Sequence, residues 1–359
     1  MNALRIYAGP QALARMRELG GLRPQDVGAV PAAAGGPKGL LLLRLDQYLF
    51  GEWLPQGQHS VQLVGASIGA WRMATACLNR PVEALQRLEH DYIHQHFEPT
   101  PPQRRPSAEQ VSTAFAQSLE SFYGGRVQEV LRHPHWHLNV VVSQGQGLLH
   151  RDGPWRTPLG YAAAYVANAV GRQYLSGWLQ RGIFSSDMAQ ASPLVADEVA
   201  THRWALNSDN FMTALRASCS IPFAMQPVHD IAGAPEGAYW DGGITDYHLH
   251  WRFSIAPDQV VLYPHFQRAV IPGWLDKAWR RRHTATPALD NMVVLAPDSD
   301  WVRKLPNGKL PDRHDFVQYA NDFSGRVRAW QRAVQESQRL CDEWQAWLSK
   351  PDWSVVSAL

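Results

Sequence analysis

The sequence has few cysteines, little net charge and no long apolar run. Its three cysteines, Cys77, Cys219 and Cys341, are odd in number and far apart, so they predict neither a disulfide framework nor a metal-binding CxxC pair. The formal net charge is only +2 over 359 residues, without the basic excess typical of nucleic-acid-binding proteins. No stretch approaches the ~20 apolar residues that span a bilayer. The N-terminus also lacks the basic-then-apolar pattern of a secretory signal. We therefore expect a cytoplasmic protein that binds no nucleic acid and touches membranes peripherally at most.

Apolar residues are plentiful, at 45% of the chain, which is enough for a full-sized core. The first eighty residues alternate between short buried-strand patterns and helical patterns. Strands are predicted at 4–7, 27–34 and 61–66, and helices at 10–19, 38–50 and 68–78. This alternation predicts an α/β fold with a mostly parallel central sheet and helices on both faces, a three-layer arrangement.

Later segments extend this pattern. Residues 81–132 are helical in pattern, apart from a polar, proline-rich surface loop at 98–106. Further strands are predicted at 137–143, 204–207, 260–263 and 292–296, and one or two helices at 316–349. We therefore expect one α/β domain over 1–300 and a C-terminal helical extension over 301–359, packed on the same domain.

The sharpest motif is Gly65-Ala66-Ser67-Ile68-Gly69. It matches G-x-S-x-G and lies between an apolar strand and a helix, the context in which this motif forms a nucleophile elbow. The glycines let two backbones pass closely, and the helix N-terminus directs N–H groups toward a developing oxyanion. The pattern predicts that Ser67 is a nucleophile, although a tightly packed structural junction would use the same small residues.

Two glycine pairs accompany this motif. Gly35-Gly36-Pro37-Lys38-Gly39 also joins a strand to a helix, and its backbone N–H groups are suited to an anion. It lacks the spacing of a phosphate-binding loop or a dinucleotide turn, but a plain turn stays open. Asp241-Gly242-Gly243 places an acid at a strand end, where an ordinary Asp-Gly turn is the alternative.

A fourth segment, Ala217-Ser218-Cys219-Ser220-Ile221-Pro222-Phe223, completes an ordered series. The chain resembles the patatin-like phospholipase family over about residues 27–245. Four motifs in order carry this resemblance: the glycine-rich turn, the G-x-S-x-G motif, this segment and the D-G-G motif. Two positions depart from the family pattern. Ala34 stands where the glycine run usually begins, and Ile244 to His248 lack the usual asparagine and proline.

The resemblance implies a patatin-like fold and a Ser–Asp dyad in which Ser67 is the nucleophile and Asp241 its base. It further implies an oxyanion hole formed by the amides of Gly35 and Gly36, joined by that of Ile68. Supporting loop positions would be Lys38, Gly39, Gly65, Gly69, Gly242 and Gly243. The expected substrate is a lipid ester, as for a phospholipase A or lysophospholipase, and the chemistry needs no metal or cofactor.

Other functions remain open on the sequence. A general carboxylesterase with a conventional triad could pair Ser67 and Asp241 with His248 or His265. A catalytically inactive protein that binds acyl chains or a partner is a second alternative, and a nucleotide-binding protein is a third. The segment 272–283 combines tryptophans with clustered arginines, which predicts either an interfacial helix on anionic lipid or an ordinary basic surface helix. The oligomeric state is not predicted by any of these features.

Overall fold

A computed structural model describes residues 2–97, 106–189, 194–195 and 198–359. Its centre is a mostly parallel sheet in the order β13-β1-β12-β11-β2-β3-β4-β5-β7, with β9 joined to β4 and β8 to β9. The strands are β1 (Leu4–Ala8), β2 (Val27–Ala32), β3 (Val61–Ala66), β4 (Trp136–Gly145), β5 (Leu179–Ser185), β7 (Thr201–Ala205), β8 (Val228–His229), β9 (Ala238–Asp241), β11 (Val260–Pro264), β12 (Met292–Pro297) and β13 (Val356–Ala358), with β6 (Leu194–Val195) and β10 (Arg252–Phe253) paired separately.

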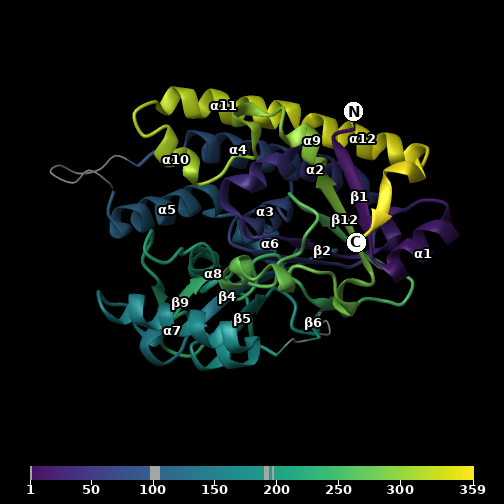
Figure 1. Cartoon of the computed structure of the whole chain (residues 1–359). Helices are drawn as coiled ribbons and strands as arrows, with labels where there is room; N and C mark the ends of the chain where they lie inside the picture. The colour runs from purple at the N-terminus through teal and green to yellow at the C-terminus, as the bar shows by residue number, and fades with distance from the viewer. Residues whose placement is uncertain (1, 98–105, 190–193, 196–197) are drawn as a thin grey trace.

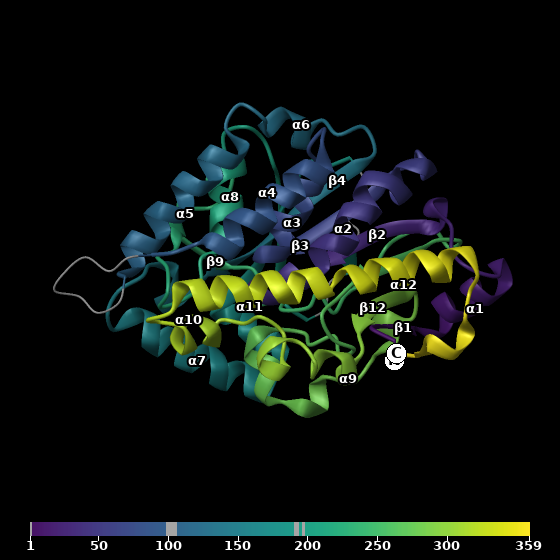
Figure 2. The same cartoon turned by 90° about the horizontal axis from the view of Figure 1, so that it is seen from above.

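Helices flank this sheet (Figures 1 and 2), most of them on one face and α7 (Arg156–Val170) on the other. The helices are α1 (Pro10–Leu19), α2 (Leu43–Tyr48), α3 (Ile68–Ala76), α4 (Pro81–His94), α5 (Ala108–Tyr123), α6 (Val127–Leu131), α7 (Arg156–Val170), α8 (Phe211–Ser218), α9 (Ser299–Val302), α10 (His314–Gln318), α11 (Phe323–Glu336) and α12 (Gln338–Ser349). Every residue of β2, β3, β11 and β12 is buried, as expected of parallel strands covered on both faces. The predicted α/β class, with its C-terminal helical segment, is confirmed.

The two faces of the sheet are covered differently. The larger core lies under the helices, where apolar residues of α2, α3, α4 and α8 meet those of β3 and β4. A second core lies on the opposite face, where residues 247–271 supply most of the cover. Apart from β11 of the sheet itself, that region contains only the short strand β10 and turns, so its side chains rather than regular helices exclude water from this part of the sheet.

The chain after residue 38 departs from the predicted continuous helix over 38–50. Residues Gly36–Leu42 form a 3₁₀ turn, followed by α2 and a π-helical turn over Leu49–Trp53. The prediction followed the apolar spacing alone, whereas Gly39 lies against α3: a Cβ built on it would be 3.0 Å from Cγ1 of Ile68. The predicted strand at 204–207 is shifted as well and lies at Thr201–Ala205. Residues 98–105 of the predicted surface loop lie outside the described residues.

The C-terminal segment returns to the sheet. Helices α11 and α12 meet at buried Ser337 and pack along α4, α2 and β1. The Glu343 carboxylate accepts hydrogen bonds from the amides of Ala3 and Leu4 at 2.8–2.9 Å. Strand β13 then pairs in parallel with β1, so both ends of the chain lie at one edge of the sheet. In the part of the chain that is described, no helix is long and apolar enough to cross a membrane.

Candidate active site

Ser67 lies at a sharp turn between β3 and α3. Its backbone angles are φ 55° and ψ −129°, a region that residues with a side chain rarely adopt. The flanking glycines are required by packing: a Cβ on Gly65 would lie 2.4 Å from Cα of Ala70, and one on Gly69 would lie 2.0 Å from the carbonyl oxygen of Ala32. The G-x-S-x-G pattern therefore has a steric basis, and the turn has the geometry expected of a nucleophile elbow.

The pairing of β3 and β9 with β4 brings Asp241 to this turn. Strand β3 runs parallel to β4 and its last residue, Ala66, pairs with Val141. Strand β9 runs antiparallel along the same edge of β4, and its last residue, Asp241, pairs with Val142. The two strands thus end face to face, although they are far apart in sequence. As a result, Oγ of Ser67 donates a hydrogen bond to Oδ2 of Asp241 at 2.6 Å.

The segment 217–223 holds both strand ends in place. The hydroxyl of Ser218 accepts a hydrogen bond from the Ser67 amide at 3.0 Å and donates one to the carbonyl oxygen of Val141 at 2.6 Å. The amide of Asp241 donates to the carbonyl oxygen of Ser220 at 2.9 Å, and that of Gly242 donates to the carbonyl oxygen of Ser218 at 3.1 Å. These small side chains and backbone groups fix the separation between Ser67 and Asp241.

The Asp241 carboxylate is buried and has no cationic ion-pair partner among the described residues. Burial raises its pKa above the ordinary aspartate range, and this effect outweighs three influences that lower it. Those three are the charge of Arg313, the hydrogen bond from Ser67, and a 2.7 Å hydrogen bond from the Gly243 amide to Oδ1. A carboxylate in this environment is a stronger base than one in water.

The glycine-rich turn lies beside the same carboxylate. Gly35, Lys38, Asp241 and Gly243 line one pocket. Gly36 has φ 56°, in the left-handed region that favours glycine. Because Gly36 and Ile68 each begin a helical segment, their amides have no acceptor within the helix. The predicted site residues therefore gather at one location, including Gly39 against Ile68 and Gly242 against the backbone of β4.

Two segments that no motif marked also reach this pocket. Trp274 and Lys277 come from a 3₁₀ turn, and Arg313 comes from the segment just before α10. Asp315 holds that segment, because its Oδ2 accepts hydrogen bonds from Nε1 of Trp330 in α11 and from the amide of Asp312. The sequence around 313 has no periodicity or motif, so only the fold reveals that the C-terminal segment contributes to the site.

The histidines considered for a conventional triad are engaged elsewhere. Nδ1 of His248 bonds to the carbonyl oxygen of Ala269 at 3.1 Å, and Nδ1 of His265 bonds to that of Gln267. Among the described residues, neither ring has a hydrogen bond to Ser67 or Asp241. Burial lowers the pKa of both rings, that of His265 to about 3. No group of three or more potential metal ligands occurs within the described residues.

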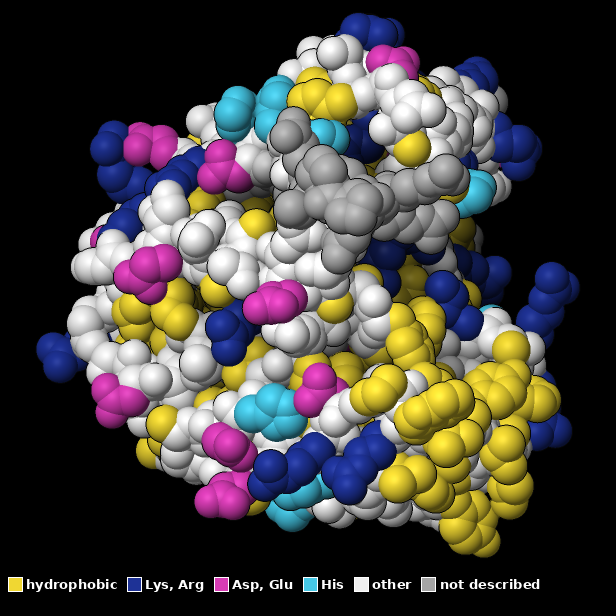
Figure 3. Space-filling view, turned by 90° about the vertical axis from the view of Figure 1, so that its left-hand side faces the viewer, with side chains coloured by type: hydrophobic (Ala, Val, Ile, Leu, Met, Phe, Trp, Pro, Cys, Tyr) yellow, Lys and Arg dark blue, Asp and Glu magenta, His cyan; other side chains and the backbone are white. Residues whose placement is uncertain are grey.

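The segment 272–283 is not the helix that its composition suggested. It forms two short 3₁₀ turns, Trp274–Ala278 and Arg280–Arg282, because Asp276 is buried and binds Arg172 and Arg282 instead of facing solvent. Exposed apolar residues gather instead on and around α7, and Figure 3 shows hydrophobic side chains at the lower right of one face. We call this set the apolar patch: Leu148, Trp155, Leu159, Tyr165, Val166, Val170, Tyr174, Phe223 and Trp274.

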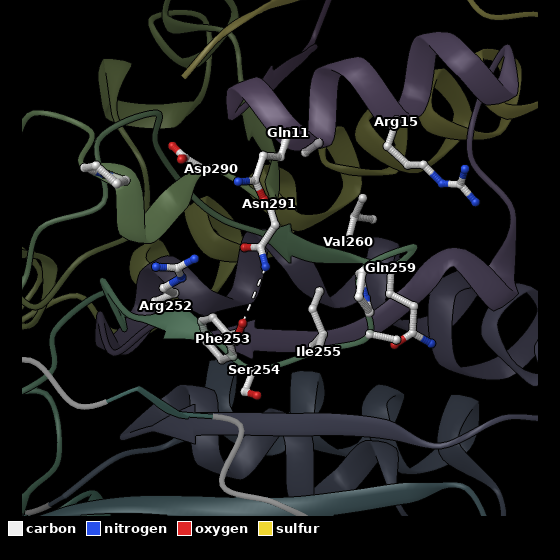
Figure 4. A pocket seen from close by; sticks show the side chains of 14 residues that line it. Gln11, Arg15, Arg252, Phe253, Ser254, Ile255, Gln259, Val260, Asp290 and Asn291 are labelled. Carbon is white, nitrogen blue, oxygen red and sulfur yellow. Dashed lines mark hydrogen bonds between the residues drawn. The ribbon is translucent and has the colours of Figure 1, made fainter.

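A second pocket lies away from the serine. Its lining includes Gln11, Arg15, Arg252 and Asp290 (Figure 4) but neither Ser67 nor Asp241. The contact drawn there joins Nδ2 of Asn291 to the carbonyl oxygen of Phe253 at 3.4 Å. None of the groups expected to react lines this pocket, so the pocket beside Asp241 is the candidate active site.

Comparisons with known proteins add little to this geometry. No family model and no curated protein matches the sequence. Among solved structures, VipD from Legionella pneumophila aligns with 95% of this chain and 70% of its own, at 13% identity and a TM-score of 0.38. The case for a function therefore rests on the residues of the site itself.

Proposed function

We propose that this protein is a serine acyl hydrolase that cleaves lipid ester bonds with a Ser67–Asp241 dyad. The observation that carries the proposal is the 2.6 Å hydrogen bond from Oγ of Ser67 to Oδ2 of Asp241, made by a serine on a strained strand-to-helix turn. A nucleophile and a base within hydrogen-bond reach are the minimum that acyl transfer to an enzyme requires.

The first half of the reaction forms an acyl-enzyme. Asp241 accepts the hydroxyl proton as Oγ of Ser67 attacks the ester carbonyl carbon, and the carbonyl oxygen becomes an oxyanion. The amides of Gly35, Gly36 and Ile68 donate hydrogen bonds to that oxygen. When the tetrahedral intermediate collapses, the carbon–oxygen bond to the alcohol breaks and the leaving alkoxide takes the proton from Asp241.

The second half releases the acid. Asp241 accepts a proton from a water molecule as this water attacks the acyl carbonyl, and the proton then returns to Oγ of Ser67 as the acyl bond breaks. The raised pKa of Asp241 supports both steps, since a stronger base takes the proton more readily. The Gly243 amide keeps the carboxylate oriented through its hydrogen bond to the oxygen that does not face Ser67.

The apolar patch favours a lipid substrate over a small soluble ester. Helix α7 contains one charged residue, Arg156, and exposes the large apolar side chains Leu159, Tyr165, Val166 and Val170. An exposed apolar helix face is unusual in a soluble protein and is typical of a surface that meets lipid or a partner. The patch continues to the pocket, because Phe223 packs on Tyr161 of α7 and Trp274 lines the pocket itself.

A fluorophosphonate probe tests the proposal, since it labels only an activated serine. Wild type should be labelled at Ser67, while Ser67→Ala and Asp241→Asn should lose labelling. Ser324→Ala, at an exposed position on α11, is the matched control and should be labelled normally. Absence of labelling in folded wild type would favour a binding protein. Labelling that survives Asp241→Asn would require another base and would contradict the dyad.

A further inference from the structure

Three basic side chains converge on the pocket that holds Asp241. Lys38 follows the glycine pair, Lys277 lies in the turn Trp274–Ala278, and Arg313 precedes α10. They come from three distant parts of the chain, so their convergence is a product of the fold. Figure 3 shows Lys and Arg side chains in a hollow next to the hydrophobic area.

Two of these side chains lie over aromatic rings. Nζ of Lys38 lies 5.0 Å from the ring centre of Phe266, and Nζ of Lys277 lies 5.1 Å from that of Tyr247. These aromatic faces support the cations but carry no net charge. Within the described ranges, none of the three cations forms an ion pair with a carboxylate.

Arg313 lies directly on the glycine turn. A Cβ built on Gly36 would be 3.2 Å from Nε of Arg313, so the guanidinium packs beside an amide expected to bind the oxyanion. The neighbouring Asp312 also lines the pocket, but its carboxylate binds Lys309 at 2.7 Å rather than Arg313. The pocket thus keeps an excess of positive charge next to the reacting groups.

Electrostatics support the same conclusion. Burial lowers the pKa of Lys38, and the charge of Lys277 is the next influence. Burial also lowers the pKa of Lys277, and the charge of Arg313 is again the next influence. Like charges that repel one another in a cleft are stabilised by a bound anion, and such a cleft raises the local concentration of anionic ligands.

We propose that Lys38, Lys277 and Arg313 form a specificity site for a phosphoryl group carried by the substrate ester. The inference rests on the proposed hydrolase function and adds that the enzyme selects anionic over neutral lipid esters. Arg313 offers paired donors that match two phosphoryl oxygens, whereas the lysines act as point charges. Because Arg313 lies beside Gly36, a phosphoryl group bound to it would lie close to the ester carbonyl that Ser67 attacks. A small glycerol ester has this short spacing between its phosphoryl group and its ester group.

The test compares two esters with the same acyl chain, 1-acylglycerol 3-phosphate and 1-acylglycerol. Wild type should show a higher kcat/KM for the phosphorylated ester. Lys277→Gln and Arg313→Gln should each lower the ratio of the two kcat/KM values on the order of tenfold, mainly through KM. Exposed Lys350→Gln and Arg328→Gln, outside the pocket, are the matched controls and should keep the wild-type ratio.

Salt and inorganic phosphate provide independent measurements. The KM for the phosphorylated ester should rise with ionic strength, and inorganic phosphate should compete with it in wild type more strongly than in Arg313→Gln. Equal kcat/KM values for the two esters in wild type, or an unchanged ratio in both pocket variants, would overturn the inference while leaving the hydrolase intact. If wild type is neither labelled by a fluorophosphonate nor active on either ester, the hydrolase proposal itself fails.

Discussion

Replacing Asp241 with asparagine should abolish hydrolysis and at the same time stabilise the protein at neutral pH. The buried carboxylate has two hydrogen-bond donors, Ser67 and the Gly243 amide, but no ion-pair partner among the described residues. Burying an ionised carboxylate costs several kcal/mol, and each hydrogen bond to it returns roughly 1.5–3 kcal/mol. Because the pKa of Asp241 is raised, the cost of burying the charge exceeds the stabilisation from these hydrogen bonds. Asparagine, a neutral side chain of the same shape, should therefore raise the free energy of unfolding by about 1 kcal/mol.

The stabilisation by Asp241→Asn should depend on pH, and linkage gives its direction. A carboxyl group whose native pKa is above its unfolded value, about 4, binds more protons in the native state, so rising pH destabilises the native protein. The difference in free energy of unfolding between the asparagine variant and wild type should be small below about pH 4. It should grow as the pH rises through the native pKa and be complete above it. Since 1 kcal/mol moves the Tm of a chain this long by only about 1 °C, denaturant unfolding at a series of pH values is the suitable assay.

A paired carboxylate provides the contrast. Asp246 is equally buried but binds Arg181 through both oxygens, at 2.6 and 2.7 Å. Asp246→Asn should cost about 3–5 kcal/mol because it leaves a buried guanidinium without its partner. If Asp241→Asn instead destabilises the protein at pH 7, or if its effect is independent of pH, the argument that Asp241 is an energetically unfavourable, functional carboxylate is refuted.

Four further changes test other parts of the structure. Arg313→Gln removes a charge that lowers the pKa of Asp241, so the acid limb of the kcat/KM profile should move to higher pH; an unmoved limb would mean that Asp241 is not the titrating base. Gly69→Ala places a Cβ 2.0 Å from a carbonyl oxygen of β2, so unfolding in denaturant should show a loss of about 3 kcal/mol; a stable, labelled variant would contradict the packing. Ser67→Gly should be more stable than Ser67→Ala by about 1 kcal/mol, because only glycine relieves the positive φ, and equal stability would argue against strain. Leu159→Lys, at an exposed position of α7, should weaken sedimentation with lipid vesicles while changing stability by less than about 0.5 kcal/mol, and undiminished binding would exclude the apolar patch as the lipid surface.

The sequence by itself determined the α/β class and the strand-to-helix turn that holds Ser67. Buried strands and amphipathic helices have strong periodicity, so β3 and α1 lie where they were predicted, at 61–66 and 10–19. The glycines around Ser67 are likewise a local signal, since the strand-to-helix turn itself demands them. Periodicity was misleading over 38–50, because the chain there follows the demands of a close approach to α3 rather than its own apolar spacing.

The tertiary structure decided which distant groups meet. The pairing of β3 and β9 along one edge of β4 joins Ser67 to Asp241, and no pattern within either segment encodes that pairing. The same holds for Arg313, which reaches Gly36 only because Asp315 and Trp330 hold the C-terminal segment over the pocket. Local propensity depends on residues a few positions apart, whereas these contacts depend on strand register and helix packing across the whole chain. The two residues of the proposed dyad could therefore be singled out in the sequence, but the convergence of Lys277 and Arg313 on their pocket became visible only in the fold.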